Sequence, residues 1–201
     1  MVGEQLEMNE DFVRAAIAAY TELYGEPTRT HRFSRTEPGG ATAVVVYLPD
    51  ERDRMVPKDN VTSLGTAGFG AAEICSDFPC EIGMEIQGEL DDAACEAMAR
   101  SLIDLANVPL QSGRLFQDGQ VLSNVSLPIF SQFSMAMLVD WESVYGFRFP
   151  APLSDVGCLR LVPLFETEAD FVESQDDRHS AYRALRVRGM NEVDPDRTAV
   201  I

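Results

Sequence analysis

Two groups of carboxylates contain the residues of this sequence whose types and spacing could do chemistry. The first recurs at every fourth residue and comprises Glu81, Glu85 and Glu89. The second follows an apolar segment and comprises Glu166, Glu168, Asp170, Glu173, Asp176 and Asp177. Paired carboxylates can transfer protons or bind Mg²⁺ or Ca²⁺. Such sites usually lie in pockets whose apolar surroundings shift a pKa, and the sequence indicates no such pocket. A solvated face is therefore favoured, and a protein-binding surface and a metal or catalytic site remain the alternatives.

The other chemistry-bearing residues form no catalytic or cofactor-binding pattern. Gly-x-Ser-x-Gly is absent, and His31 and His179 stand too far apart in sequence to indicate a metal triad. The glycine-rich segment 65–70 lacks a Walker lysine and the GxGxxG spacing, so it favours a tight turn. Cys75 and Cys80 could form a disulfide, but buried thiols are favoured because no export signal precedes them. We therefore expect no enzyme activity, no cofactor and no bound metal.

Charge and length set the class of partner. The chain has 201 residues, a length that suits one domain, and its formal net charge is −17. This charge repels phosphate backbones and anionic membranes, so neither nucleic acid nor a membrane is expected as a partner. It would steer a basic protein instead. The segment 1–10 lacks the pattern of a signal peptide, and no apolar run approaches the roughly 18 residues of a membrane span. The sequence therefore predicts a cytoplasmic protein.

The N-terminal half is expected to combine one helix with four strands. Periodicity predicts a helix over 9–24, with Asn9 as its N-cap and residues 1–8 frayed. Strands are predicted at 30–34, 42–48, 61–64 and 81–88, the first two as a hairpin around the Pro-Gly-Gly turn at 38–40. In the last of these strands apolar and acidic residues alternate, which predicts a half-buried strand with an exposed acidic face.

The C-terminal half is expected to contain both helices and strands as well. A helix is predicted from Asp91 or Asp92 to Asn107, followed by strands at 121–125, 133–139 and 159–165. Pro163 predicts a bulge or an edge position in the last strand. Helices are predicted at 166–174 and 178–187. These elements favour an α+β fold with one mixed, mainly antiparallel sheet and helices packed against it, as a single domain over 1–201.

An aromatic segment precedes the strand at 159–165. It contains Trp141, Tyr145, Phe147 and Phe149. Such a cluster favours the core, although Trp and Tyr are also enriched at binding hot spots. Use in an interface is the alternative.

Two C-terminal segments resemble a known family. Residues 157–168 join an apolar strand to an acidic helix start, and residues 193–201 contain an Asp-Pro turn followed by a short apolar tail. The strand Glu81–Ile86 and the helix that follows it keep the same order as in that family. Together these segments resemble the Suppressor-of-fused family, over about residues 40–201 and best over 61–201.

The resemblance implies a binding protein rather than an enzyme. Animal members are larger, two-lobed proteins that hold a transcription factor by strand addition, and this chain has room for only one lobe. Short bacterial members resemble immunity proteins of polymorphic toxin systems, and the negative charge would suit a basic toxin. We therefore expect an immunity-type protein, with a regulatory adaptor as the alternative and a carboxylate-dependent metalloenzyme less favoured. The expected protein-binding residues are Glu81, Glu85, Glu89, Glu166, Glu168, Asp170 and Glu173.

Overall fold

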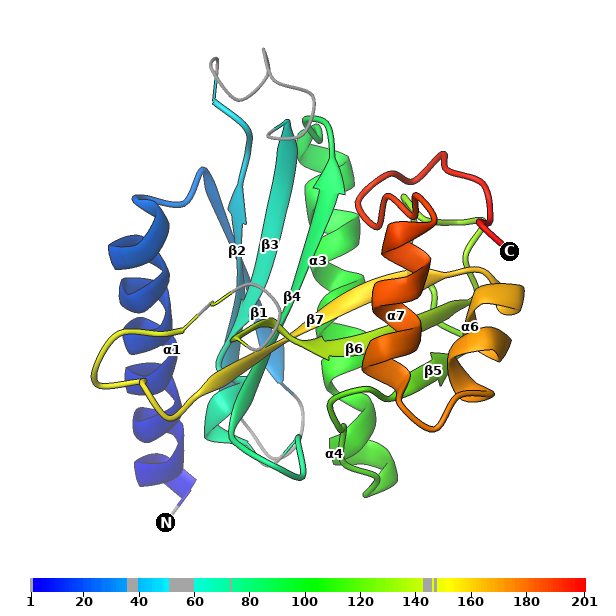
Figure 1. Cartoon of the computed structure of the whole chain (residues 1–201). Coiled ribbons are helices and arrows are strands. Elements are labelled where there is room, and N and C mark those ends of the chain that lie inside the picture. Colours follow the sequence, from blue (N-terminus) through cyan, green and yellow to red (C-terminus); the bar gives the residue numbers. More distant parts are fainter. Residues whose placement is uncertain (1, 36–39, 51–59, 73, 143–145, 147) are drawn as a thin grey trace.

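One mixed sheet organises the chain in the computed structural model, which describes residues 2–35, 40–50, 60–72, 74–142, 146 and 148–201. The strand order is β1-β2-β3-β4-β7-β6-β5 (Figure 1). Neighbouring strands are antiparallel except β4 and β7, which run parallel from Cys80↔Gly157 to Gly83↔Arg160. The strands are β1 (Arg29–Arg35), β2 (Gly40–Tyr47), β3 (Val61–Ala67), β4 (Cys80–Gln87), β5 (Val121–Ser123), β6 (Met135–Asp140) and β7 (Gly157–Leu164). This confirms the predicted α+β class.

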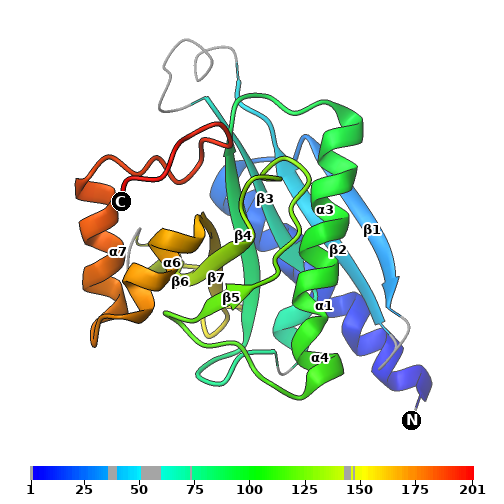
Figure 2. The same cartoon turned by 90° about the vertical axis from the view of Figure 1, so that its right-hand side faces the viewer.

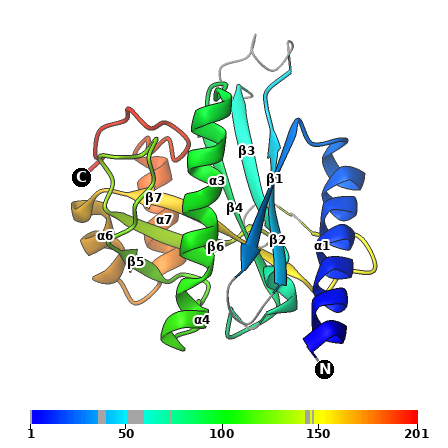
Figure 3. The ribbon, with the colours of Figure 1, turned by 180° about the vertical axis from the view of Figure 1, so that it is seen from behind.

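Helices cover both faces of the sheet. On one face α1 (Val2–Tyr24) packs on β2 and β3, and α6 (Glu166–Glu173) and α7 (Arg178–Val187) pack beside β6 and β7 (Figures 1 and 2). On the other face lie α3 (Asp92–Ala106) and the short α4 (Val108–Ser112) (Figure 3). A single 3₁₀ turn, η1 (Phe69–Ala71), follows β3. Between α1 and α7, none of the described helices covers the front of the upper parts of β3 and β4 (Figure 1).

The central strand β7 shows how the core is divided. Leu159 and Leu161 point to the α3 side, whereas Cys158 packs on the α1 side and Val162 packs against α6 and α7. Successive side chains of a strand alternate between its two faces, so an apolar run of this kind is buried on both. Pro163 lies beyond the residues that pair with β4, and its described strand neighbour is β6 alone. Its missing N–H therefore removes no bond to β4, consistent with the predicted edge-like position.

Local rules explain most of the element boundaries. The hairpin β1–β2 and the helix α7 form as predicted, although residues 36–39 of the expected turn and the expected loop at 51–59 lie outside the described residues. Asp91 caps α3, since its side chain accepts a hydrogen bond from the Ala94 amide at 2.8 Å. Asp177 caps α7 in the same way through the Ser180 amide at 3.0 Å. This role accounts for one of the acids in the second predicted group.

Two sequence predictions are wrong. The first helix begins at Val2 rather than at Asn9, because the intervening Glu, Gln, Leu and Met residues are strong helix formers and outweigh the capping preference of Asn9. Cys75 and Cys80 form a disulfide with their Cα atoms 6.2 Å apart, whereas buried thiols were expected. The remaining cysteines, Cys95 and Cys158, are buried thiols.

The strand β4 also differs from its prediction. Ile82, Met84 and Ile86 pack towards α3 as the alternation suggests. The opposite face is only partly solvated, however, because the turn after β3 buries Glu81 and the Trp141 ring lies over Gly83. Alternation identifies two faces, but a polar face can still be covered when its groups find partners. Within the part of the chain that the structure describes, no helix is both long and apolar enough to cross a membrane.

Candidate functional site

The three acids predicted on β4 occupy different environments. Glu81 is fully buried, with 0% of its surface exposed. The Glu85 side chain is 29% exposed and pairs with a buried arginine, and Glu89 is exposed just beyond the end of the strand. The predicted exposed acidic face is therefore wrong for Glu81. A partner could reach Glu85 and Glu89 but not Glu81 in this conformation.

Glu81 holds the turn that follows β3. Its carboxylate accepts hydrogen bonds from the amides of Gly68 and Gly70, both at 2.9 Å, and from Phe69 at 3.2 Å. The hydroxyl of Thr66 donates a fourth bond at 2.7 Å and accepts one from the Ile82 amide. Burial raises the pKa of Glu81 to about 7, and these four hydrogen bonds act in the opposite direction. The glycine-rich segment thus binds a carboxylate of its own chain.

A second buried network connects β4, β7 and the C-terminal segment. Arg160 on β7 donates to Glu85 at 2.8 Å and to Glu192 at 2.9 Å, and its side chain is almost completely buried. The Tyr182 hydroxyl donates to Glu192 as well. The guanidinium carbon of Arg160 lies 5.8 Å from the centre of the Trp141 ring. A buried arginine that bonds two carboxylates is satisfied, and this one fixes the orientation of Glu85.

The acids of α6 divide between its two faces. Glu166, Asp170 and Glu173 are exposed and follow helical spacing along one side of the helix. In the described part of the chain they form no ion pair with an arginine, lysine or histidine. Glu168 lies on the opposite face and is 0% exposed, so the prediction that it belongs to a binding surface does not fit its burial. The α6 face formed by the other three remains accessible to a partner.

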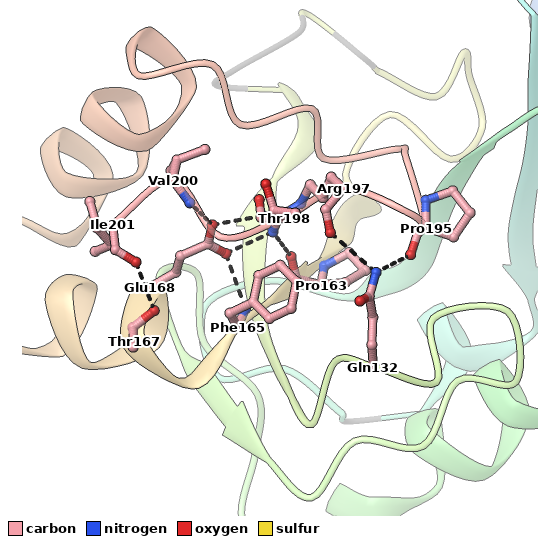
Figure 4. A network of polar contacts seen from close by, with 10 residues as sticks. All are labelled: Gln132, Pro163, Phe165, Thr167, Glu168, Pro195, Arg197, Thr198, Val200 and Ile201. Carbon is pink, nitrogen blue, oxygen red and sulfur yellow. Dashed lines mark hydrogen bonds and ion pairs between the residues drawn. The ribbon is translucent and has the colours of Figure 1, made fainter.

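Glu168 instead anchors the C-terminal tail through Arg197 (Figure 4). Both carboxylate oxygens of Glu168 accept from the guanidinium, each at 2.7 Å, in a bidentate pair. Arg197 also donates to the Pro163 carbonyl at 2.9 Å and lies against the paired rings of Phe133 and Phe165, 4.9 and 5.1 Å from their centres. We call this pair with its two rings the tail clamp. It joins the two segments that carry the family resemblance.

Backbone contacts complete the attachment of the tail. Glu168 accepts from the amides of Phe165 at 3.0 Å and Val200 at 3.2 Å. The Gln132 amide donates to the carbonyls of Pro195 and Arg197 (Figure 4). The tail clamp is therefore a structural site, because its polar groups are bonded to one another and point away from solvent.

An aromatic pocket lies between the end of α1 and the strands β2, β3 and β4. It encloses a volume of about 60 Å³. Tyr24 from α1 is 55% exposed and stands beside Tyr47 of β2, with ring centres 5.6 Å apart. The lining is Tyr20, Tyr24, Val45, Tyr47, Ser63, Leu64, Gly65, Glu85 and Trp141. Sequence reasoning missed this pocket, since it placed Trp141 in a cluster that favours the core.

Two glycines lie beneath the buried rings of the pocket. Gly65 and Gly83 are register partners on β3 and β4. A Cβ atom on Gly65 would lie 2.5 Å from the Tyr20 hydroxyl oxygen, and one on Gly83 would lie 2.1 Å from the Trp141 ring. Only glycine lets these rings lie directly on the sheet. Glycines inside strands often mark such close approaches, and this was the feature from which the pocket could have been predicted.

Burial keeps the two outer tyrosines of the pocket neutral. Burial, followed by the charges of Cys158 and Glu85, raises the pKa of Tyr24 to about 12. Burial and the charge of Glu26 raise the pKa of Tyr47 to about 12. Both tyrosines are neutral hydrogen-bonding groups at physiological pH. Across the described ranges, no three His, Cys, Asp or Glu side chains gather as metal ligands would.

Comparisons with known proteins agree on one family. A family model described as Suppressor of fused protein (SUFU) matches residues 44–198. The fold is similar to that of a protein described as a SUFU homologue from Neisseria gonorrhoeae FA 1090, with a TM-score of 0.64 and 14% identity, covering 96% of this chain and 98% of that one. A chain of the Sufu–Fu complex gives a TM-score of 0.64 at 13% identity, covering 94% of this chain and 92% of that one.

A longer relative shares only part of its length with this chain. Drosophila Suppressor of Fused gives a TM-score of 0.63 at 13% identity, covering 94% of this chain but 51% of that one. The present chain thus spans about half of the Drosophila protein. No curated protein matches the sequence. At such low identities the solved structures show a shared fold, and the family model covers most of the chain. The chain therefore belongs to the Suppressor of fused protein family.

Proposed function

We propose that this chain is a non-enzymatic protein-binding module of the immunity type, which neutralises a basic toxin domain in the cytoplasm. The SUFU fold supports a binding role, since one structure with this fold is a complex between Sufu and Fu. The net charge of −17 supports a basic partner. Complementary charge accelerates association and disfavours wrong partners.

The observation that carries this proposal is the exposed face of α6. Glu166, Asp170 and Glu173 lie on one side of the helix and form no ion pair with the described cations. Exposed carboxylates that no neighbouring cation neutralises attract an approaching basic partner. Glu85 and Glu89, the other predicted binding acids, are also accessible, although Glu85 is paired with Arg160. Glu81 and Glu168 act inside the fold instead.

A regulatory adaptor is the second candidate. It is favoured by the Sufu–Fu complex, which associates a chain of this fold with a protein partner. The two candidates differ in the partner that they require. A toxin domain encoded beside this gene would support the immunity role, and a partner without toxicity would support the adaptor.

Capture of the partner tests the proposal directly. Tagged protein is incubated with a lysate of the source organism at low and at high salt, and the bound proteins are identified by mass spectrometry. We expect one stoichiometric basic partner whose toxicity is suppressed when the two proteins are produced together. A captured toxin that stays fully active in this assay would refute the immunity role.

Two triple variants separate a local interface from the general field. The variant Glu166→Gln/Asp170→Asn/Glu173→Gln removes three charges from α6. The control Glu22→Gln/Asp104→Asn/Asp155→Asn removes three exposed charges elsewhere. We expect the association rate to fall about threefold to tenfold at low salt for the α6 variant, less for the control, with the difference fading at high salt. Equal rates for the two variants would exclude α6 as the interface.

A further inference from the structure

The aromatic pocket beside the end of α1 combines ring faces with a carboxylate. We infer that this pocket binds the guanidinium group of an arginine side chain that a partner protein presents. The inference rests on the proposed function only in taking the partner to be a protein. It adds a specific contact to a surface that was otherwise defined by charge.

The arrangement of the rings suits a planar cation. Tyr24 and Tyr47 meet at an interplanar angle of 57°, and the exposed Tyr24 forms the open side of the pocket. Tyr20 and Trp141 are buried and lie on the sheet over the paired glycines. Cations bind to the faces of tyrosine and tryptophan rings through the ring quadrupole. Val45, on the α1 side of the sheet, provides apolar surface for the methylene stem.

Glu85 supplies the negative charge. Its Oε2 atom accepts from Arg160 at 2.8 Å, and its side chain is 29% exposed, so a partner can reach the carboxylate. Arg160 is itself satisfied by a second carboxylate, Glu192. Glu85 lines the pocket together with the rings, so its carboxylate is placed to pair with a cation that lies against them.

The size of the pocket limits the ligand. A volume of about 60 Å³ corresponds to roughly four to six water molecules at ~10–15 Å³ each. This space accepts a side-chain head group but not a nucleotide or a folded loop. A guanidinium is favoured over an ammonium because it is planar, weakly hydrated and able to stack while it bonds a carboxylate.

The single tryptophan of the chain provides the assay, since Trp141 lines the pocket. N-acetyl-L-arginine methylamide is titrated while the fluorescence and the indole N–H resonance of Trp141 are followed. N-acetyl-L-citrulline methylamide is the matched neutral ligand, and the lysine analogue tests the choice of cation. We expect saturable binding of the arginine derivative and at least fivefold weaker binding of the other two. Equal binding of the citrulline or lysine analogue would overturn the inference.

Variants locate the binding. Tyr24→Leu removes an exposed ring without disturbing the core, and Glu85→Gln removes the charge. Both should weaken binding of the arginine derivative at least fivefold, whereas the control Asp104→Asn, an exposed acid on α3, should leave it unchanged. Glu85→Gln also affects the buried Arg160, so circular dichroism must show that each variant is folded. If Glu85→Gln is unfolded, the test is decided by Tyr24→Leu alone. Unchanged binding by folded Tyr24→Leu would refute the pocket.

The two proposals fail in different ways. The titration uses no partner, so absence of saturable binding refutes the arginine pocket and leaves the proposed function standing. A lysate that yields no protein partner refutes the proposed function, whereas arginine binding measured in the titration would persist. Loss of partner capture on Tyr24→Leu, with capture retained by the control Asp104→Asn, would support both together.

Discussion

Breaking the tail clamp should destabilise the whole fold. In the variant Arg197→Met, Glu168 keeps only two backbone donors while it stays fully buried. Removing one member of a buried ion pair costs about 3–5 kcal/mol, because the remaining charge is uncompensated. The loss of the cation–π contacts with Phe133 and Phe165 adds about 0.5–2 kcal/mol. Against a typical total of about 5–15 kcal/mol, this is a large fraction of the stability.

The double variant tests the physical reason. Glu168→Gln alone leaves the guanidinium of Arg197 buried without its counter-charge, and should also cost about 3–5 kcal/mol. Arg197→Met/Glu168→Gln leaves no buried charge, so it should be more stable than either single variant. The coupling energy between the two positions should therefore reach at least about 2 kcal/mol. Urea unfolding followed by far-ultraviolet circular dichroism gives all four free energies of unfolding.

An exposed ion pair supplies the matched control. Arg100 and Glu96 lie one turn apart on α3, 3.2 Å from each other, and both side chains are mostly exposed. The variants Arg100→Met and Glu96→Gln should show a coupling energy of about 0.5 kcal/mol or less. A coupling at the tail clamp that is no larger than this control would refute the argument from burial.

Three further predictions concern other buried groups. Folded protein keeps a proton on Glu81 up to about pH 7, whereas the unfolded chain releases it near the ordinary pKa of 4.5. The free energy of unfolding should therefore fall by up to about 3 kcal/mol as the pH rises between these values. In urea unfolding at pH 5 and pH 8, the variant Glu81→Gln should not show this decrease. Gly83→Ala should lose about 1–3 kcal/mol through overpacking and alter Trp141 emission; unchanged emission and stability would contradict the contact. In urea without reductant two thiols should react rather than four, and reduction of the short Cys75–Cys80 loop should lower the free energy of unfolding by about 2 kcal/mol; four reactive thiols would contradict the pairing.

Local patterns were sufficient for most elements of the fold. The capping residue Asp91 and the periodicity that follows it predicted α3, and the hydrophobic run at 159–165 predicted β7. These features depend on neighbours in sequence, which a linear pattern contains. The start of α1 was misplaced because Asn9 has a local capping preference that continuous helix propensity on both sides outweighs. Such competition between local preferences is decided by small energies.

Features that depend on distant residues were not predictable in the same way. Glu81 was expected in solvent because its strand alternates, yet its partners lie in the turn at 66–70, contributed by a different strand. The aromatic pocket needs Gly65 and Gly83 to become register partners, and a sequence does not contain the register between strands. The burial of Glu168 likewise depends on Arg197, almost thirty residues later. Long-range pairing therefore decided which acids are exposed.

The segments that identify the family are concerned with structure rather than with recognition. The Glu168–Arg197 pair joins residues 157–168 to 193–201, and the Gln87 amide donates to the Val193 carbonyl at 2.7 Å to fix the same tail beside β4. Two proteins can share these contacts and still bind different partners, because the contacts are buried. Discrimination between partners must come from exposed groups, which here are the α6 face and the Tyr24 side of the aromatic pocket. A relative that keeps the tail clamp but lacks the exposed ring and Glu85 should therefore keep the fold and lose the arginine site.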